Sequence, residues 1–357
     1  TAYRSTDGAK SWQSIKDYDG TDTLKYAFDR IFNMDFSRQD KNFGVAVNRT
    51  GLWITEDKGA TWEPHTNNSI KFWSDSKRRD FDCLSAVAFD PTDDSKIYVG
   101  SGNFWDVKGN HRTKENLHGG PGGGMEWGKV NPGKIWRSDD RGESWTLINK
   151  GINPDAEIGQ IFVDPEENNI VYAATTHGFY KSEDFGNSWQ LKNKGLDTGA
   201  LRDMDLFHDP KTGDVILYII DQVYWEYDGS GEIACSGGIF KSYDKGETWE
   251  NITSNDLFIN LRELNNREIN RRTFSPWGLT GWFGMKWKEA WQKFDIPDAI
   301  LPMFNRLVVD PRNRDRIYIT HNARHSPSIP LDAVWATENG GDNWYITTRI
   351  GYGWQKD

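Results

Sequence analysis

The sequence has little of what several common classes of protein require. It has two cysteines among 357 residues, which excludes a scaffold held together by many disulfides. No apolar run approaches the ~20 residues that a membrane-spanning helix needs. Acidic residues outnumber basic ones by 53 to 43, so the net charge of −10 argues against a protein that binds the phosphate backbone. We therefore expect no nucleic-acid partner and no membrane span.

Aromatic residues, by contrast, are abundant. The chain has 18 Trp, 13 Tyr and 18 Phe, far more than a disordered segment would carry. Many of these aromatic residues belong to a pattern that occurs six times. It reads aromatic, any residue, Ser or Thr, any residue, Asp, any residue, Gly, two residues, Trp. The copies lie at 3–12, 53–62, 136–145, 180–189, 240–249 and 335–344. Ala9 replaces the glycine of the first copy, and Asn339 replaces the aspartate of the last.

A second pattern precedes most copies of the first. It consists of an apolar stretch, Asp-Pro, a polar turn and a short run rich in β-forming residues. It occurs at 86–100, 160–174, 205–219 and 306–320, with a degenerate version at 33–47. Together the two patterns predict four antiparallel strands per repeat, with turn residues between them. Such a unit is the blade of a β-propeller.

The double pattern resembles the BNR, or Asp-box, repeat of sialidases, two-propeller xyloglucanases and sortilin-type receptors. The resemblance covers nearly the whole chain. It implies an all-β fold, a β-propeller of four-stranded antiparallel blades with about six Asp-box blades in a single domain over 1–357. We expect a partial blade at 1–12, full blades at 33–62, 84–145, 158–189, 203–249 and 304–344, and an insertion at 250–303.

The partial first blade leaves the ring incomplete. A larger propeller, or a further chain or domain, would supply the missing strands, because propellers avoid unpaired edges. A strand within 345–353 would instead close a six-bladed ring.

The repeated polar residues favour a structural role over a catalytic one. Ser or Thr and Asp side chains bond the backbone of tight turns, and glycine supplies a positive φ. The closing tryptophan is expected to pack between neighbouring blades. We assign this role to the aspartates of the motif, Asp7, Asp57, Asp140, Asp184 and Asp244.

The long insertions point to one working surface. Successive strands of a blade run in opposite directions, so connections between the second and third strands emerge at the same end as connections between blades. The insertions at 101–133, 220–236, 321–332, 63–83 and 250–303 are all of these two kinds. They therefore open opposite the Asp-box turns, where a rigid scaffold presents loops for function. The alternative is that they cap the axial channel.

These insertions hold the candidate site residues. Tryptophan can stack on a sugar face, and glycoside hydrolysis uses two carboxyl groups, whereas a polysaccharide lyase uses a base such as histidine. The candidate catalytic residues are Glu126, Glu226, Asp106, His111 and His321, and the candidate substrate-binding residues are Trp105, Trp127, Trp225, Arg112, Arg324 and His325. His321 and His325 lie in a loop-like stretch, so we expect no metal there, and the sequence indicates no cofactor.

The first hypothesis is therefore a secreted, extracellular or cell-surface propeller that binds and cleaves a polysaccharide, as a hydrolase first and a lyase second. A resemblance to the two-propeller xyloglucanases implies that one propeller would hold only one of the two catalytic acids. The alternative hypotheses are a sortilin-like module that binds a peptide or protein, and a cell-surface assembly protein.

Overall fold

The computed structural model describes residues 3–15, 31–48, 51–65, 69–70, 82–102, 133–227, 233–260, 299–300, 304–321 and 333–349. Within these ranges the secondary structure is strand, apart from one short 3₁₀ helix, η1, at Asn255–Leu257. The chain divides into two compact units. Unit 1 contains residues 1–107 and 123–191, and unit 2 contains residues 108–122 and 192–357.

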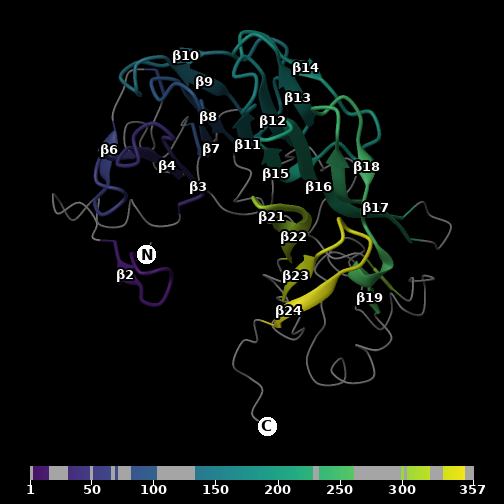
Figure 1. Cartoon of the computed structure of the whole chain (residues 1–357). Helices are drawn as coiled ribbons and strands as arrows, with labels where there is room; N and C mark the ends of the chain where they lie inside the picture. Colours follow the sequence, from purple (N-terminus) through teal and green to yellow (C-terminus); the bar gives the residue numbers. More distant parts are fainter. Residues whose placement is uncertain are drawn as a thin grey trace, which may run out of the picture. The chain divides into compact units, whose positions relative to one another are not determined.

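Unit 1 contains one two-stranded and three four-stranded antiparallel sheets among its described residues (Figure 1). Each sheet is a meander in which neighbours in sequence pair with each other. The two-stranded sheet consists of β1 (Tyr3–Arg4) and β2 (Gln13–Ser14). The four-stranded sheets are β3 (Asn33–Phe36), β4 (Gly44–Asn48), β5 (Gly51–Thr55) and β6 (Glu63–His65); β7 (Leu84–Phe89), β8 (Ile97–Ser101), β9 (Ile135–Ser138) and β10 (Thr146–Leu147); and β11 (Ile158–Val163), β12 (Val171–Thr175), β13 (Gly178–Ser182) and β14 (Gln190–Leu191).

Unit 2 repeats the same meander twice within its described residues. Its four-stranded sheets are β15 (Leu201–Asp209), β16 (Asp214–Tyr227), β17 (Ile233–Ser242) and β18 (Glu250–Asn251); and β21 (Phe304–Asp310), β22 (Asn313–His321), β23 (Ala333–Thr337) and β24 (Tyr345–Arg349). A short pair, β19 (Ile259–Asn260) and β20 (Ala299–Ile300), lies between them in sequence. The prediction of an all-β fold built from four-stranded antiparallel blades is thus confirmed, and the exact blade boundaries stay a prediction.

Apolar side chains fill the space between consecutive blades of each unit. One cluster joins β3–β6 to β7–β10, and a second joins β7–β10 to β11–β14. In unit 2 a third cluster joins β15–β18 to β21–β24. Each closing tryptophan in these clusters lies with residues of its own blade and of the blade before it, as Trp145, Trp189 and Trp344 show. The prediction that the closing tryptophans pack between blades is therefore confirmed at these positions.

The two turns of a blade meet at one end, which we call the hairpin end. The backbone N–H after the motif Asp or Asn donates to a carbonyl of the turn between the first two strands. The pairs are Lys58 to Asn42, Arg141 to Ser95, Phe185 to Asn169, and Gly340 to Asp315. We call the opposite end, where the insertions leave the blades, the loop end.

Candidate functional site

Most of the predicted site residues lie outside the described residues. These are Trp105, Asp106, His111, Arg112, Glu126, Trp127, Arg324 and His325. For Trp225, Glu226 and His321 the structure gives the strand position of the backbone only. His321 is the last residue of β22, where it pairs with Phe304, and so stands at the loop end of its blade.

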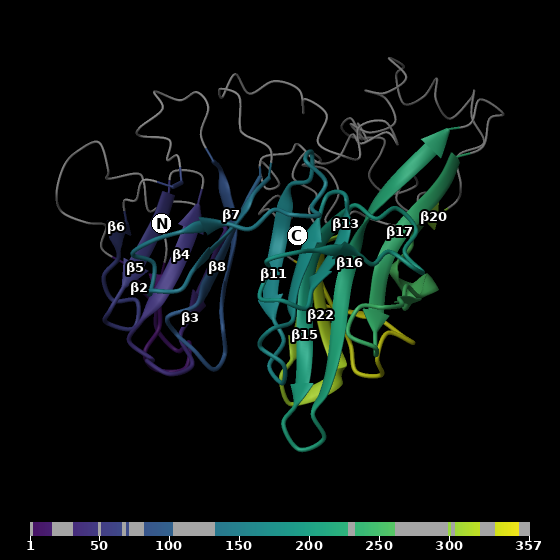
Figure 2. The same cartoon turned by 90° about the horizontal axis from the view of Figure 1, so that it is seen from above.

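The insertion predicted at 220–236 differs from expectation. It is largely a β-hairpin rather than a loop, because β16 runs on to Tyr227 and β17 begins at Ile233 (Figure 2). In this extension Trp225 pairs with Cys235, and Glu226 with Ala234. The stretch Val-Tyr-Trp-Glu-Tyr at 223–227 has the aromatic and β-branched residues that strands favour, which is the physical reason for the difference. Trp225 and Glu226 therefore stand on a regular strand.

A buried aspartate fixes the base of this extended hairpin. Asp221 is fully buried where the register shifts between Asp221 and Tyr224. Its carboxylate accepts hydrogen bonds from the backbone N–H groups of Asp197, at 2.9 Å, and Thr198, at 2.8 Å, and from the Thr198 hydroxyl. Burial raises the pKa of Asp221 to about 6, although these hydrogen bonds oppose the shift. Asp221 is not among the site residues predicted from the sequence, and the signal for it is its place within β16, at the end of the apolar run 215–220.

The insertion at 250–303 is tied down at both of its ends. Strands β19 and β20 pair antiparallel, so residues 260 and 299 are brought together. Before them, the Asp256 carboxylate in η1 accepts a 3.0 Å hydrogen bond from the backbone N–H of Trp344. The insertion is thus anchored to the closing tryptophan of the β21–β24 blade.

The described residues at the loop end of the β7–β10 blade include an ion pair. Lys134, directly before β9, lies 2.8 Å from the carboxylate of Asp82, whose side chain is almost fully buried. The Lys134 ammonium also lies over the Trp136 ring, 5.6 Å from its centroid. Both ends of the 103–132 insertion are held here, since the Ser101 N–H donates to the Lys134 carbonyl at 2.9 Å.

The hairpin end has the same pattern of hydrogen bonds in the five copies of the motif that have aspartate. In the third copy the Ser138 hydroxyl donates to Asp140 Oδ1 at 2.7 Å and accepts from the Gly142 N–H at 2.8 Å. The other half of the turn closes through Ser144, whose N–H and hydroxyl donate to Asp140 at 2.8 and 2.5 Å. In the last copy Asn339 keeps the bond from the Asn343 N–H, at 3.1 Å. This geometry agrees with a structural role for the motif.

Hydrogen bonds within the turn stabilise the ionised form of the motif aspartates and lower their pKa values. Hydrogen bonds from the Ser144 side chain and backbone, with smaller help from Ser138, lower the pKa of Asp140. The Ser11 side chain does the same at Asp7 and lowers its pKa to about 2. A carboxylate stabilised in this way is a poor proton donor or acceptor at neutral pH.

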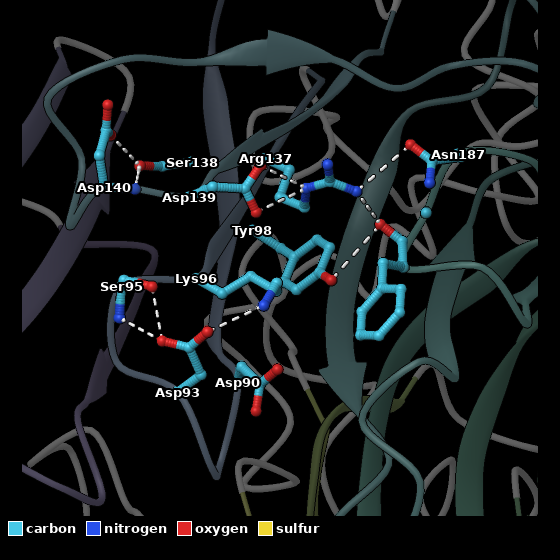
Figure 3. Close-up of polar contacts among 12 residues, drawn as sticks. Asp90, Asp93, Ser95, Lys96, Tyr98, Arg137, Ser138, Asp139, Asp140 and Asn187 are labelled. Carbon is cyan, nitrogen blue, oxygen red and sulfur yellow. Dashed lines mark hydrogen bonds and ion pairs between the residues drawn. The ribbon is translucent and has the colours of Figure 1, made fainter.

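Charged side chains at the hairpin end of β7–β10 also satisfy one another (Figure 3). Lys96 lies 2.9 Å from Asp93, and Arg137 lies 3.0 Å from Asp139. Arg137 donates to the Phe185 carbonyl of the next blade at 2.7 Å, and the Tyr98 hydroxyl donates to the same oxygen at 3.4 Å. These contacts therefore join two blades, and the charged groups named here are bonded to one another or to the backbone.

In the part of the chain that the structure describes, no helix is long and apolar enough to cross a membrane. Across those same ranges, no three His, Cys, Asp or Glu side chains are grouped so that they would hold a metal ion.

Comparison with known proteins supports the fold. The family described as Sortilin, neurotensin receptor 3 matches residues 133–257. The comparison with curated proteins found no match. Among solved structures, an ancestral GH74 enzyme is similar with a TM-score of 0.53 and 16% identity, over 97% of this chain and 34% of that one. The chain thus spans about a third of that enzyme, at 34%.

Two further structures are similar at lower scores. The Niastella koreensis GH74 enzyme has a TM-score of 0.49 and 16% identity, over 88% of this chain and 38% of that chain. YCF48 bound to D1 peptide has a TM-score of 0.37 and 15% identity, over 90% and 83%. The chain has a β-propeller fold, and its residues 133–257 match the sortilin family model. Likeness at this level of identity establishes the fold, and the function must be argued from the site.

Proposed function

We propose that the protein is a secreted or cell-surface propeller that binds a polysaccharide at its loop end and hydrolyses it. The observation that supports this proposal is the difference between the two ends of the blades. At the hairpin end the polar groups of the motif bond one another. At the loop end the backbone of Trp225 and Glu226 lies in the β16–β17 extension, past the last residue of β16 that pairs with β15. Rigid presentation of this kind suits a binding and catalytic surface.

The roles follow from the chemistry of the side chains. Tryptophan faces stack on sugar rings, and we assign this role to Trp105, Trp127 and Trp225. A carboxyl pair would supply the acid and the base or nucleophile, drawn from Glu126, Glu226 and Asp106. For an acidic polysaccharide, Arg112, Arg324 and His325 would bind the uronate carboxylate, and His111 or His321 would remove the neighbouring proton in a lyase reaction. The likeness to an ancestral GH74 enzyme is one of fold, so the proposal of a hydrolase rests on the carboxyl residues named above.

The test is a release assay on a panel of neutral and acidic polysaccharides that includes xyloglucan. Reducing ends and the absorbance of unsaturated uronates are both measured. Hydrolysis predicts reducing ends without absorbance, and their loss in Glu226→Gln. Glu143→Gln, an exposed glutamate at the hairpin end, is the matched control and should retain full activity. Release with absorbance would indicate a lyase, and no release from any polymer would contradict the catalytic proposal.

A peptide-binding function is the second candidate, because the sortilin family matches residues 133–257. This function would use the same loop end without catalysis. Binding of an extended peptide library that is insensitive to Glu226→Gln, with no retention on any polysaccharide, would favour it over the first proposal.

A further inference from the structure

The β16–β17 pair changes register at the point where the body of the blade passes into the extended hairpin (Figure 2). After the pair of Asp221 with Gly238, β16 has two residues, 222–223, where β17 has one. Two residues opposite one form a β-bulge, which bends the strand and increases its twist. In the described residues of the other four full blades, the second and third strands pair without such a shift. The bulge therefore sets the direction in which the extension leaves this blade.

Glycine occupies the two positions of β17 that face the bulge. Gly237 and Gly238 have φ of 92° and 141°, a range that favours glycine because other side chains are strained there. A Cβ atom at Gly237 would lie 2.5 Å from the carbonyl oxygen of Gln222, and one at Gly238 would collide with Thr253 Oγ1. The two strands thus approach each other closely, along a path that depends on both glycines.

The connection that leads into β15 holds the β16 side of the bulge. Asp221 is fully buried, and its carboxylate accepts the backbone N–H groups of Asp197 and Thr198 and the Thr198 hydroxyl. The backbone N–H of the next residue, Gln222, donates to the Ala200 carbonyl at 2.8 Å. The start of the bulge is therefore bonded to a segment outside the β16–β17 pair.

The same connection holds the β17 side as well. The Asp197 carboxylate accepts the backbone N–H of Gly237 at 3.2 Å. Asp221 thus bonds the backbone at Asp197, and Asp197 bonds the backbone of the opposite strand. Because both acceptors are carboxylates, these bonds are stronger than bonds between neutral groups. The bend at the bulge cannot change without breaking them.

Other blades have a different side chain at the position of Asp221. Ser101 of β8 and Thr175 of β12 also pair with the start of the first strand of their blades. Their hydroxyls accept the backbone N–H groups of Lys134 and His177, which belong to the connection that follows. Asp221 instead bonds the connection that precedes its blade, and β16 continues past it. The side chain at this position thus differs according to whether the second strand ends or extends.

We propose that Asp221, assisted by Asp197, is a positioning residue for the loop-end site, because it fixes the bulge and with it the direction of the strands that contain Trp225 and Glu226. Its part in polysaccharide hydrolysis rests on the proposed function, whereas the fixing of the extension depends on the contacts alone. Bulges beside functional sites redirect side chains in this way. A site on strands with bonded supports also keeps its geometry more precisely than a site on loops.

Hydrogen exchange of the amides at 224–227, in the whole chain, measures how firmly the extension is held. Asp221→Ala removes the acceptor of three hydrogen bonds, so we expect about tenfold faster exchange. Asp221→Asn keeps a carbonyl oxygen for the two backbone N–H groups and should restore slow exchange. Asp164→Ala is the matched control, because Asp164 is also fully buried and accepts two backbone N–H groups, from Glu166 and Glu167, but at the hairpin end. It should leave exchange at 224–227 unchanged.

The release assay on the polysaccharide panel tests the link between this support and the site. In Asp221→Ala we expect kcat/KM to fall by about tenfold or more, because misplaced groups lose rate. Asp221→Asn should recover it, and Asp164→Ala should not lower it. A role in global stability alone would lower the unfolding midpoints of Asp221→Ala and Asp164→Ala and leave kcat/KM of both folded proteins unchanged. That result would overturn the positioning role.

A second variant keeps the test decisive if Asp221→Ala does not fold. Asp197→Ala removes only the bond to Gly237, from an exposed side chain, and should speed exchange at 224–227 by about threefold. Unchanged exchange in the folded variants of Asp221 and Asp197 would overturn the inference, whatever the activity. A wild-type protein that releases no sugar from any polymer would contradict the proposed hydrolysis, and the exchange measurement would still decide whether Asp221 fixes the extension.

Discussion

At the hairpin end the same hydrogen bonds recur from blade to blade, whereas at the loop end the connections between strands differ in length and structure. The Asp140 turn is matched bond for bond at Asp57 and Asp184. At the loop end, β12 and β13 are joined by Thr176 and His177 alone, while β16 and β17 extend into a long hairpin. The repeated turns at the hairpin end therefore specify the fold, and the connections at the loop end can vary without changing it.

The same contrast appears in the carboxylates. Hydrogen bonds lower the pKa of Asp140 at the hairpin end, whereas burial raises that of Asp221 at the loop end to about 6. Hydrogen bonding to the charged form and removal from water act in opposite directions, and local exposure decides which is larger. Carboxyl groups with raised pKa values are the ones able to exchange protons near neutral pH.

The largest expected effect is on the tryptophans that close the repeated turns. Trp189 is buried between two blades, and its indole N–H donates to the Ile148 carbonyl at 2.7 Å. Trp189→Ala should lower the free energy of unfolding by about 3–5 kcal/mol, because it leaves a cavity and an unpaired carbonyl. Urea unfolding monitored by circular dichroism measures this loss.

Trp12→Ala is the control for that change, since the same residue type in the same motif is exposed. We expect it to cost less than about 1 kcal/mol in dilute solution. Should Trp189→Ala fail to fold, Trp189→Phe would retain part of the packing and give a smaller, measurable loss. Equal losses at Trp12 and Trp189 would contradict the view that the blade interface, and not the turn itself, determines the contribution of the tryptophan.

The sequence was sufficient for the repeated part of this architecture and insufficient for the rest. Turn chemistry is local, so Asp-x-Gly and Asp-Pro predict the strands, their order and the closing tryptophans. The hairpin around Trp225 could not be predicted as a pair of strands, because its strand signal is confined to residues 223–227. The anchoring role of Asp221 could not be predicted either, because its partners, Asp197 and Thr198, are distant in sequence. The catalytic and binding roles of the loop residues remain predictions.

A second, smaller effect should appear in the pH dependence of stability. Because the folded-state pKa of Asp221 is raised to about 6, the native state binds more protons than the unfolded state between about pH 4 and 6. Stability therefore falls as the pH rises through this window. Asp221→Asn removes this loss, so the variant should gain up to about 3 kcal/mol relative to the wild type between about pH 4 and 7.

Urea unfolding at both ends of that range measures the difference. Asp205 is also buried with a raised pKa, but it is present in both proteins and cancels in the comparison. Asp140→Asn is the control, because a carboxyl with a lowered pKa is ionised throughout this range and should give no pH-dependent difference. A parallel pH profile for wild type and Asp221→Asn would show that Asp221 is not the titrating group.

The smallest expected effect concerns the one motif turn in which the glycine is displaced. Two consecutive residues are left-handed in each turn: Lys58 and Gly59 have φ of 61° and 78°, and Gly8 and Ala9 have φ of 73° and 66°. The first copy thus places alanine where the others have glycine, at a cost of about 1 kcal/mol that the greater freedom of glycine in the unfolded chain partly offsets. Ala9→Gly should therefore stabilise the hairpin by about 0.5 kcal/mol.

Hydrogen exchange of the Lys10 and Ser11 amides reports on this turn directly, because both donate to Asp7 Oδ1 at 3.0 Å. We expect about twofold slower exchange in Ala9→Gly, as the free-energy change implies. The double variant Gly8→Lys with Ala9→Gly places lysine before glycine, as at Lys58 and Gly59. Its Lys10 and Ser11 amides should exchange no faster than those of the single variant, since Lys58 adopts the same left-handed conformation. Faster exchange in the double variant would mean that the first left-handed position, and not the second, limits this hairpin.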